Sequence, residues 1–300
     1  MLNKISKIKY INSPLIKFRK VFLIIFLLAI SIGIIFLFKD TLFVLFNKIP
    51  TVPDFTKEIS LSNVQKIITS EPLIKKEDAS ESQLTAIGVF YWTNYYREKN
   101  GKAPLKQSVI LNASATLKAK DMFAQQYFEH TSPTGEDAGY WVNKEGYEFI
   151  IIGENLALGN FQNDEALVNG WMASPGHKAN ILNPSYTEIG IAVIKATYQG
   201  KETWMAVQHF GRPLSDCSMP DETLKNRVIG YDAELNNLKN QLLELQKILK
   251  SKNKMTKEEY NKKVDQYNAI LLEYNSIYDA VKVLADTYNE QVQQFNNCIK

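Results

Sequence analysis

Three short phrases decide the fold of this chain: E-H-T-S-P at 129–133, G-E-N-L-A at 153–157 and W-M-A-S-P-G-H-K-A-N-I-L at 171–182. They contain His130 and His177, two of the chain's three histidines, with Glu154 between them in the sequence. The phrases are unlike one another and are scattered through otherwise ordinary polar sequence. This pattern is typical of a site that folding assembles from separate segments, and not of a single core helix.

Residues 81–214 are predicted to form one domain of the α+β class. Apolar residues at helical spacing predict three helices, over 80–100, 108–127 and 163–172. Alternating or continuous apolar residues predict three strands, over 147–152, 189–195 and 202–210. Helices followed by nearby strands favour an antiparallel sheet packed by helices.

The N-terminal region predicts a membrane anchor. Six basic residues and no acidic residue precede residue 21, so the remaining chain carries 3 − 6 = −3 of the net charge of +3. Val21–Phe38 contains no charged residue and as a helix would span about 27 Å, close to the hydrocarbon thickness of a bilayer. We therefore expect a cytoplasmic basic tail (1–20), a single transmembrane helix (21–38) and an extracytoplasmic remainder that begins with a linker (39–80). A cleaved signal peptide is the alternative.

Residues 221–299 are predicted to form an antiparallel coiled-coil hairpin. Apolar residues from Leu224 to Leu249, and again from Tyr260 to Ile299, alternate in steps of four and three, which is the heptad pattern. Thr256 and Glu259 have the spacing of a capping box at the start of the second helix. Self-association of two or more chains through the same stripes is the alternative.

The two cysteines, Cys217 and Cys298, are predicted to form a disulfide at the base of this hairpin. In an antiparallel hairpin they return to the same end, offset by about 13 Å if both arms were helical. An extended segment before the first helix can absorb that offset. An extracytoplasmic location permits the bond. Free thiols and an intermolecular bridge remain alternatives.

Together with Y-T-E-I-G-I-A at 186–192 and Q-H-F-G at 208–211, the three phrases resemble the bacterial branch of the CAP superfamily. That superfamily includes cysteine-rich secretory proteins, antigen 5 and pathogenesis-related 1 proteins, and its domain is also called SCP. The resemblance covers about 83–213. It implies an α-β-α sandwich, with a central antiparallel sheet between helix layers, and a cleft with two histidines and two glutamates. In some members the histidines bind zinc.

Three of the four cleft residues match this resemblance: His130, Glu154 and His177. The position of the second glutamate, three residues after the helix tryptophan, is Ser174 here. This departure puts in doubt any mechanism that needs two carboxylates. Ser174 and Asn155, which follows Glu154, are further candidates for ligand binding.

The cleft residues allow three interpretations. Two imidazoles and a carboxylate could bind a divalent metal and leave a position open for water, which makes His130 and His177 the candidate metal ligands and zinc the candidate cofactor. Without metal, Glu154 could orient a histidine for acid–base catalysis by the same three residues. Alternatively, they form a buried hydrogen-bonded network that fixes loops around the sheet. His209, on the last predicted strand, is expected to be a packing residue.

The sequence supports one main function and two alternatives. We expect a membrane-anchored extracytoplasmic protein that binds an envelope glycan, lipid or protein through the cleft. A metal-dependent hydrolase that uses His130, His177 and Glu154, and a coiled-coil envelope scaffold, are the alternatives, so the sequence leaves open whether the protein is an enzyme. After residue 20 there is no basic stripe with interleaved aromatics, so no nucleic-acid partner is expected.

Overall fold

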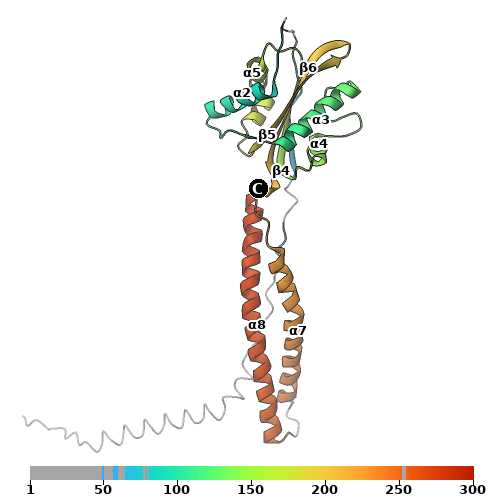
Figure 1. Ribbon diagram of the computed structural model, residues 1–300. Coiled ribbons are helices and arrows are strands. Elements are labelled where there is room, and N and C mark those ends of the chain that lie inside the picture. Colours follow the sequence, from blue (N-terminus) through green and yellow to red (C-terminus); the bar gives the residue numbers. More distant parts are fainter. Residues whose placement is uncertain (1–48, 51–56, 60–64, 77–78, 80, 252–254) are drawn as a thin grey trace, which may run out of the picture. The chain divides into compact units, whose positions relative to one another are not determined.

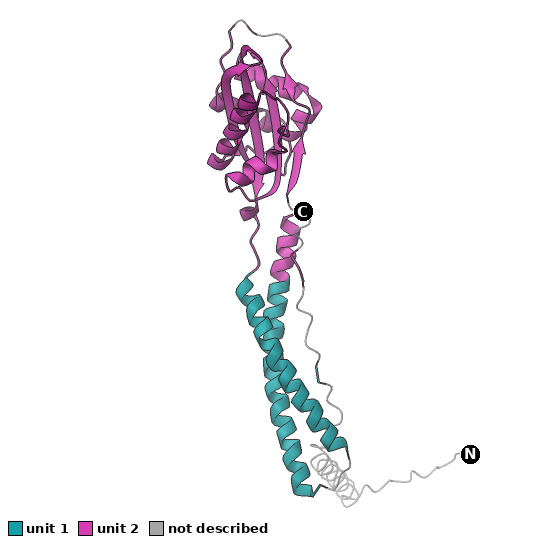
Figure 2. Ribbon diagram, turned by 90° about the vertical axis from the view of Figure 1, so that its right-hand side faces the viewer, with its two compact units in different colours: residues 1–56, 221–289 teal, residues 57–220, 290–300 magenta. Residues whose placement is uncertain are grey.

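The computed structural model describes residues 49–50, 57–59, 65–76, 79, 81–251 and 255–300. The predicted basic tail and the predicted transmembrane segment lie outside these residues. Within the described ranges no helix is long and apolar enough to cross a membrane. The chain divides into two compact units (Figure 2). The sheet unit comprises the described residues of 57–220 together with 290–300, and the helical unit comprises 221–289 with 49–50.

One sheet of six strands forms the centre of the sheet unit. In chain order these are β1 (Lys66–Thr69), β2 (Leu73–Ile74), β3 (Lys106–Gln107), β4 (Phe149–Leu158), β5 (Glu188–Tyr198) and β6 (Lys201–Pro213). The order across the sheet is β1-β4-β6-β5-β3, and β2 also pairs with β4. The long strands β4, β6 and β5 pair antiparallel, as expected. The short strands β1, β2 and β3 pair in parallel, which the sequence did not predict.

Helices cover both faces of this sheet (Figure 1). The helices of the unit are α2 (Ala86–Lys99), α3 (Val109–Gln125), α4 (Ala138–Lys144), α5 (Asp164–Ala173) and α6 (Pro175–Ile181). Successive residues of β4 point to opposite faces. Ala157 belongs to the apolar cluster that includes residues of α2, α5 and α6, whereas Leu156 and Leu158 belong to the cluster of α3. The layers are therefore helix, sheet and helix, as the resemblance implied.

The sheet extends into the segment that was predicted as a linker. Residues 39–80 were expected to be a tether, yet Lys66–Thr69 and Leu73–Ile74 are strands that pair with β4. The expectation was wrong for these residues because two- and four-residue strands carry too little periodicity to be seen in a sequence. Helices α4 and α6, of seven residues each, escaped prediction for the same reason.

The helical unit contains two long helices, α7 (Glu222–Lys250) and α8, which runs from Lys257 to Cys298 and so continues into the sheet unit. Residues of the two predicted stripes, among them Leu235, Leu242 and Tyr267, are buried in one apolar cluster that α7 and α8 share. The capping box is present: the Thr256 amide donates to the Glu259 carboxylate at 2.8 Å, and the Glu259 amide donates to Thr256 Oγ1 at 3.2 Å.

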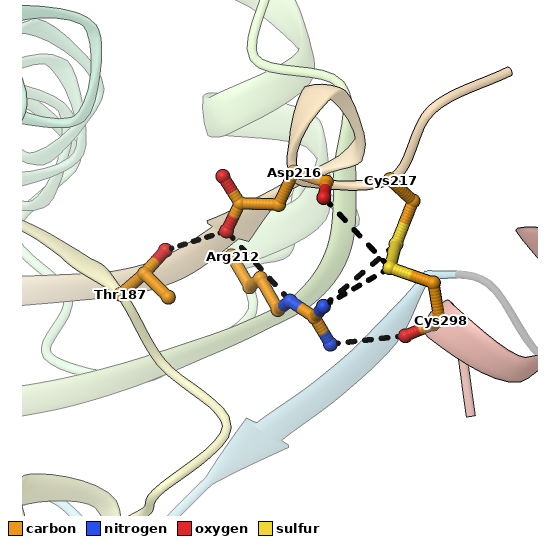
Figure 3. The surroundings of a disulfide bond; sticks show 5 residues. All are labelled: Thr187, Arg212, Asp216, Cys217 and Cys298. Carbon is orange, nitrogen blue, oxygen red and sulfur yellow. Dashed lines mark hydrogen bonds and ion pairs between the residues drawn. A yellow bond between two sulfur atoms is a disulfide. The ribbon is translucent and has the colours of Figure 1, made fainter.

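The predicted disulfide is confirmed. Cys217 and Cys298 are bonded, with their Cα atoms 5.8 Å apart (Figure 3). Both cysteines belong to the sheet unit. Arg212 fixes the surroundings, because its Nη1 donates to the Cys298 carbonyl at 3.1 Å and its Nε lies 3.7 Å from the Asp216 carboxylate. Phe295 and Ile299 pack with Cys217 in a small apolar cluster.

Candidate functional site

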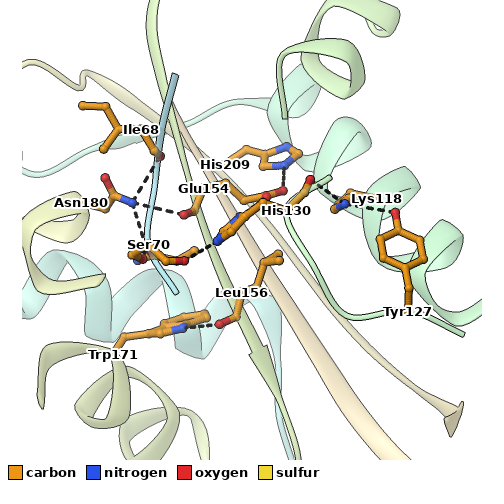
Figure 4. Close-up of polar contacts among 11 residues, drawn as sticks. Ile68, Ser70, Lys118, Tyr127, His130, Glu154, Leu156, Trp171, Asn180 and His209 are labelled. Atoms are coloured by element: carbon orange, nitrogen blue, oxygen red, sulfur yellow. Dashed lines mark hydrogen bonds and ion pairs between the residues drawn. The ribbon is translucent and has the colours of Figure 1, made fainter. Parts of the chain in front are cut away.

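Glu154 is the centre of the candidate site (Figure 4). It lies in the middle of β4, fully buried. Its Oε1 is 2.6 Å from Nδ1 of His130, and its Oε2 is 2.9 Å from Nε2 of His209. Both carboxylate oxygens are therefore held by imidazole nitrogens. A buried carboxylate needs several hydrogen-bond and charge partners to offset the cost of desolvation. The burial of Glu154 therefore depends on both His130 and His209.

His130 contacts a hydrogen-bond acceptor with each ring nitrogen. Its Nδ1 faces Glu154, and its Nε2 faces the backbone carbonyl of Ser70. A carbonyl oxygen and an ionised carboxylate can only accept, so both ring nitrogens must carry a proton. His130 is thus an imidazolium that binds one oxygen on each side.

Electrostatics agree with this assignment. Burial opposes charge on the His130 ring, but the hydrogen bond and the negative charge of Glu154 outweigh it, so the pKa of His130 is raised above its ordinary 6.5. Burial would likewise raise the pKa of Glu154. Hydrogen bonds from His130 and His209 and the positive charges of His209 and Lys118 prevail and lower that pKa from 4.5 to about 2.

Helix α3 supplies two further members of the site. Ser114 Oγ lies 2.8 Å from Nδ1 of His209. Lys118, fully buried, donates from Nζ to the His130 carbonyl at 2.9 Å and to the Tyr127 hydroxyl at 3.1 Å. Burial lowers the pKa of Lys118, while the charge of Glu154 acts in the opposite direction. Lys118 could have been found from the sequence, because a lysine on the apolar face of a predicted helix indicates a buried charge.

His177 takes a different place from the one expected. Its Nδ1 lies 2.8 Å from Ser174 Oγ, and no contact joins its ring to Glu154 in the described structure. Its Nε2 is buried without a hydrogen-bond partner among the described residues. Burial, and then the positive charge of His130, lower the pKa of His177 from 6.5 to about 4. The ring is therefore neutral at pH 7.

The second histidine partner of Glu154 is His209, which corrects the expectation that His209 only packs. The signal was present in the strand pairing, because Glu154 and His209 are directly opposite in the β4–β6 register. Cross-strand neighbours on one face contact each other. G-E-N and Q-H-F therefore belong to one site, although their paired residues are 53 to 57 residues apart in the sequence.

Asn155 points to the other face of β4 and holds the loops together. Its Nδ2 donates to Gln208 Oε1 at 3.1 Å and to the His177 carbonyl at 3.3 Å, and its Oδ1 accepts from Asn180 Nδ2 at 3.0 Å. Asn155 and Asn180 are both buried. This side chain positions α6 and its histidine, and it offers no open surface to a ligand.

Zinc does not fit these residues as they are arranged. No group of three or more His, Cys, Asp or Glu side chains in the described part of the chain is placed to hold a metal ion. Metal ligation requires a free imidazole lone pair. His130, one of the two predicted ligands, directs both nitrogens at oxygens of its own chain. We therefore derive no chemistry from a metal here.

Comparisons with known proteins assign the middle of the chain to one family. Residues 90–210 match CAP, the cysteine-rich secretory protein family. An uncharacterized protein, YkwD, of Bacillus subtilis (strain 168) is 38% identical over 35% of this chain and 40% of its own length. An uncharacterized membrane protein of the same organism, YlbC, is 30% identical over 44% of this chain and 37% of its own length.

A solved structure of an extracellular protein containing a SCP domain, from Bacillus anthracis str. Ames, is also similar. It is 28% identical over 42% of this chain and 40% of that chain, with a TM-score of 0.37. The chain thus spans about two fifths of the length of the two curated relatives. The family match spans residues 90–210, which include His130, Glu154, His177 and His209. Residues 90–210 of this chain are therefore a domain of the CAP family, and the relatives named above are bacterial.

Proposed function

We propose that this protein is anchored in the cell membrane by residues 21–38 and that its CAP domain binds a cell-envelope ligand outside the cytoplasm, at His130 and His177. The basic N-terminal tail before an uncharged apolar segment supports this orientation. The disulfide between Cys217 and Cys298 suits an oxidising compartment. One similar protein, YlbC, is named as a membrane protein.

One observation carries the binding function: His130 is an imidazolium whose Nε2–H faces an acceptor oxygen. Glu154 holds the other side of the ring at 2.6 Å, so the orientation of that donor is fixed. At present the acceptor is the Ser70 carbonyl. Charge-assisted donors of this kind bind carbonyl, hydroxyl or anionic oxygens. Glycans, lipid head groups and polypeptides all offer such oxygens.

The hydrolase alternative receives less support from the geometry. A general base needs a free lone pair that the substrate can reach. Both nitrogens of His130 are protonated, and the neutral ring of His177 is buried. A carboxylate nucleophile must reach its substrate, and Glu154 is fully buried with both oxygens bonded. The site is therefore built to hold an oxygen atom in place more than to activate water.

The scaffold alternative requires apolar stripes on the helices that are available to bind other chains. Residues of both stripes pack in one cluster of α7 and α8 within a single chain. This supports the antiparallel hairpin over association of several chains through the same residues. The hairpin in our proposal is a spacer and not the ligand-binding part.

Binding can be measured with the full chain in lipid nanodiscs. Purified cell-wall sacculi are the first probe, scored by co-sedimentation, and anionic lipid vesicles are the second, scored by flotation. We expect one probe to be bound and His130→Gln to weaken that binding about tenfold or more, because a charge-assisted hydrogen bond is lost. Lys195→Gln, a change at an exposed position of β5, is the control. Unchanged binding by His130→Gln, with its disulfide intact, would contradict the proposal.

A further inference from the structure

Residues 65–76, here called the strap, lie along the edge of β4. The four residues of β1 pair in parallel with β4, Thr69 opposite Glu154, and β2 resumes the pairing at Leu73 opposite Ala157. Ser70 lies between the two short strands. The strap therefore passes the site at the level of its central carboxylate (Figure 4).

The strap provides the oxygen that His130 binds. The Ser70 carbonyl accepts from His130 Nε2, and the Ser70 hydroxyl lies 3.4 Å from Asn155 Oδ1. Asn180 Nδ2 reaches the Ile68 carbonyl at 3.5 Å. These contacts involve backbone atoms and one small hydroxyl. The strap thus occupies the place of a ligand of the site and contacts it mainly through its main chain.

The surface beneath the strap is built from glycines. A Cβ atom added at Gly176 would lie 2.7 Å from Cβ of Ser70, and one added at Gly139 would lie 2.8 Å from Cδ1 of Ile67. Real Cβ atoms do not approach other atoms so closely. Cβ atoms added at Gly170 and Gly159 would likewise lie 3.1 Å from Cδ2 of Leu73 and 2.5 Å from Cβ of Lys75. A groove with this floor is shaped for an extended chain.

Few side chains of the strap anchor it. Lys66, Ile67 and Thr69 are exposed, and only Ile68 and Leu73 pack, partly buried, against the apolar core. A short edge strand with no fully buried side chain can detach at low cost. Recognition through the main chain at a sheet edge is the β-augmentation mode, which accepts many sequences.

We propose that the groove formed by the β4 edge, His130, Gly139 and Gly176 is a receptor for an extended peptide, and that the strap occupies it as a displaceable intramolecular ligand. The external peptide pairs in parallel with β4 and places a carbonyl oxygen on His130 Nε2. This inference rests on the proposed function, since it names the ligand class of the same site. Because a tethered strand acts at an effective concentration in the millimolar range, it sets a threshold that the external peptide must exceed.

The test uses the full chain in nanodiscs and a fluorescent peptide with the strap's sequence, QKIITSEPLIKK. In a linker variant, residues 65–76 are replaced by a Gly/Ser segment of equal length. We expect this variant to bind the peptide about 100-fold more tightly than the wild-type chain, measured by fluorescence anisotropy. A peptide with proline at the positions of Ile67, Ile68 and Thr69 cannot pair with a strand and should not bind.

Gly176→Val in the linker variant is the matched test of the groove. The added side chain fills the space of Ser70, so peptide binding should be lost, whereas Gly230→Val, at an exposed position of α7 with nothing near its Cβ position, should leave it. A folded linker variant that does not bind the peptide would overturn the inference. So would retained binding by Gly176→Val. If the Gly/Ser linker variant does not bind the peptide but still binds sacculi or vesicles, only the assignment of the ligand as a peptide is wrong. If the Gly/Ser linker variant binds none of the three probes, the proposed function fails as well.

Hydrogen exchange of the wild-type chain decides the matter should the linker variant not fold. A displaceable strap requires the amides of Lys66–Ser70 to exchange at least about 100-fold faster than those of the β4–β6 pair, because the strap opens without unfolding the sheet. Equal protection of both groups would show that the strap is a fixed part of the sheet and would refute the inference.

Discussion

Both compact units bury apolar side chains, but among the described residues only the sheet unit also buries charged ones. In the helical unit, α7 and α8 bury an apolar seam that includes Leu242 and Tyr267. At the centre of the sheet unit, Glu154, Lys118 and His209 are fully buried and hydrogen-bonded. Each seam residue contributes according to the area it buries. In the polar site, removal of one member leaves the others buried without a partner, so the same number of deleted atoms has unequal effects in the two units.

Two signals report on the units separately. All four tryptophans, at 92, 141, 171 and 204, belong to the sheet unit. Most helical residues in the described part of the chain belong to α7, with 29 residues, and α8, with 42. Denaturation followed by tryptophan fluorescence therefore reports on the sheet unit, and circular dichroism at 222 nm reports mainly on the long helices.

The largest effect is expected from the disulfide. Cys217→Ser with Cys298→Ser opens a loop of 81 residues that contains α7 and most of α8. In the chain-entropy account this lowers the free energy of unfolding by about 4.5 kcal/mol. Because both cysteines belong to the sheet unit, the fluorescence transition should shift to lower urea. An unchanged transition midpoint would show that residues 290–300 are held in the sheet unit without the bond.

The next effect concerns the polar site. Glu154→Ala leaves the buried His209 and Lys118, and the partly buried His130, without the anion that they share. We expect a loss of about 4 kcal/mol in the fluorescence transition. Glu202→Ala is the control, since the Glu202 side chain is 73% exposed in its pair with Lys195, and it should change stability by less than about 0.5 kcal/mol. A similar small effect at Glu154 would mean that the buried charges do not depend on one another.

A smaller effect is expected in the seam. Leu242→Ala removes a fully buried side chain and should cost about 3 kcal/mol in the transition at 222 nm. The adjacent Leu243 is 39% exposed, so Leu243→Ala provides a matched control with an expected change below about 0.5 kcal/mol. Equal effects of the two changes would place the helices in a different register from the one described here.

The same contrast explains what the sequence could predict. The seam follows from a seven-residue repeat of apolar positions that is visible within each helix, so both helices could be predicted. The capping box and the pairing of Cys217 with Cys298 followed from the positions of those residues at the ends of the helices. The core of the sheet unit was recognised through its phrases and its resemblance to a family. His130 and Glu154 were correctly placed together for that reason.

What could not be predicted depends on contacts between distant segments. The strap pairs with β4, which lies about 85 residues later in the sequence. The sequence of a four-residue exposed strand does not indicate which strand it pairs with. Glu154 was expected after a strand, whereas it lies inside β4, because polar residues of β6 stand opposite it in the register. His209 replaces His177 as the second partner of Glu154 through that pairing alone. Long-range register, and not composition, determines this part of the site.

The last prediction concerns pH, and its sign differs among the site residues. The raised pKa of His130 means that its proton stabilises the fold below its ordinary 6.5, and this stabilisation is lost as pH rises through the folded-state value. Glu154 stabilises the fold above 4.5 and ceases to do so as pH falls toward about 2. His177 opposes His130: with its pKa lowered to about 4, only the unfolded chain takes up its proton between pH 6.5 and 4.

His177→Gln should therefore make the sheet unit more resistant to acid between pH 6.5 and 4, and His130→Gln should remove the stabilisation seen below the raised pKa of that ring. The chain has only three histidines, so their imidazole signals can be assigned by substitution in NMR spectra of ¹³C-histidine-labelled protein. The signal lost in His177→Gln should titrate near pH 4, and the signal lost in His130→Gln should titrate above 6.5. A reversed order would place the positive charge on His177. It would contradict the assignment of His130 as the charged donor that faces the strap.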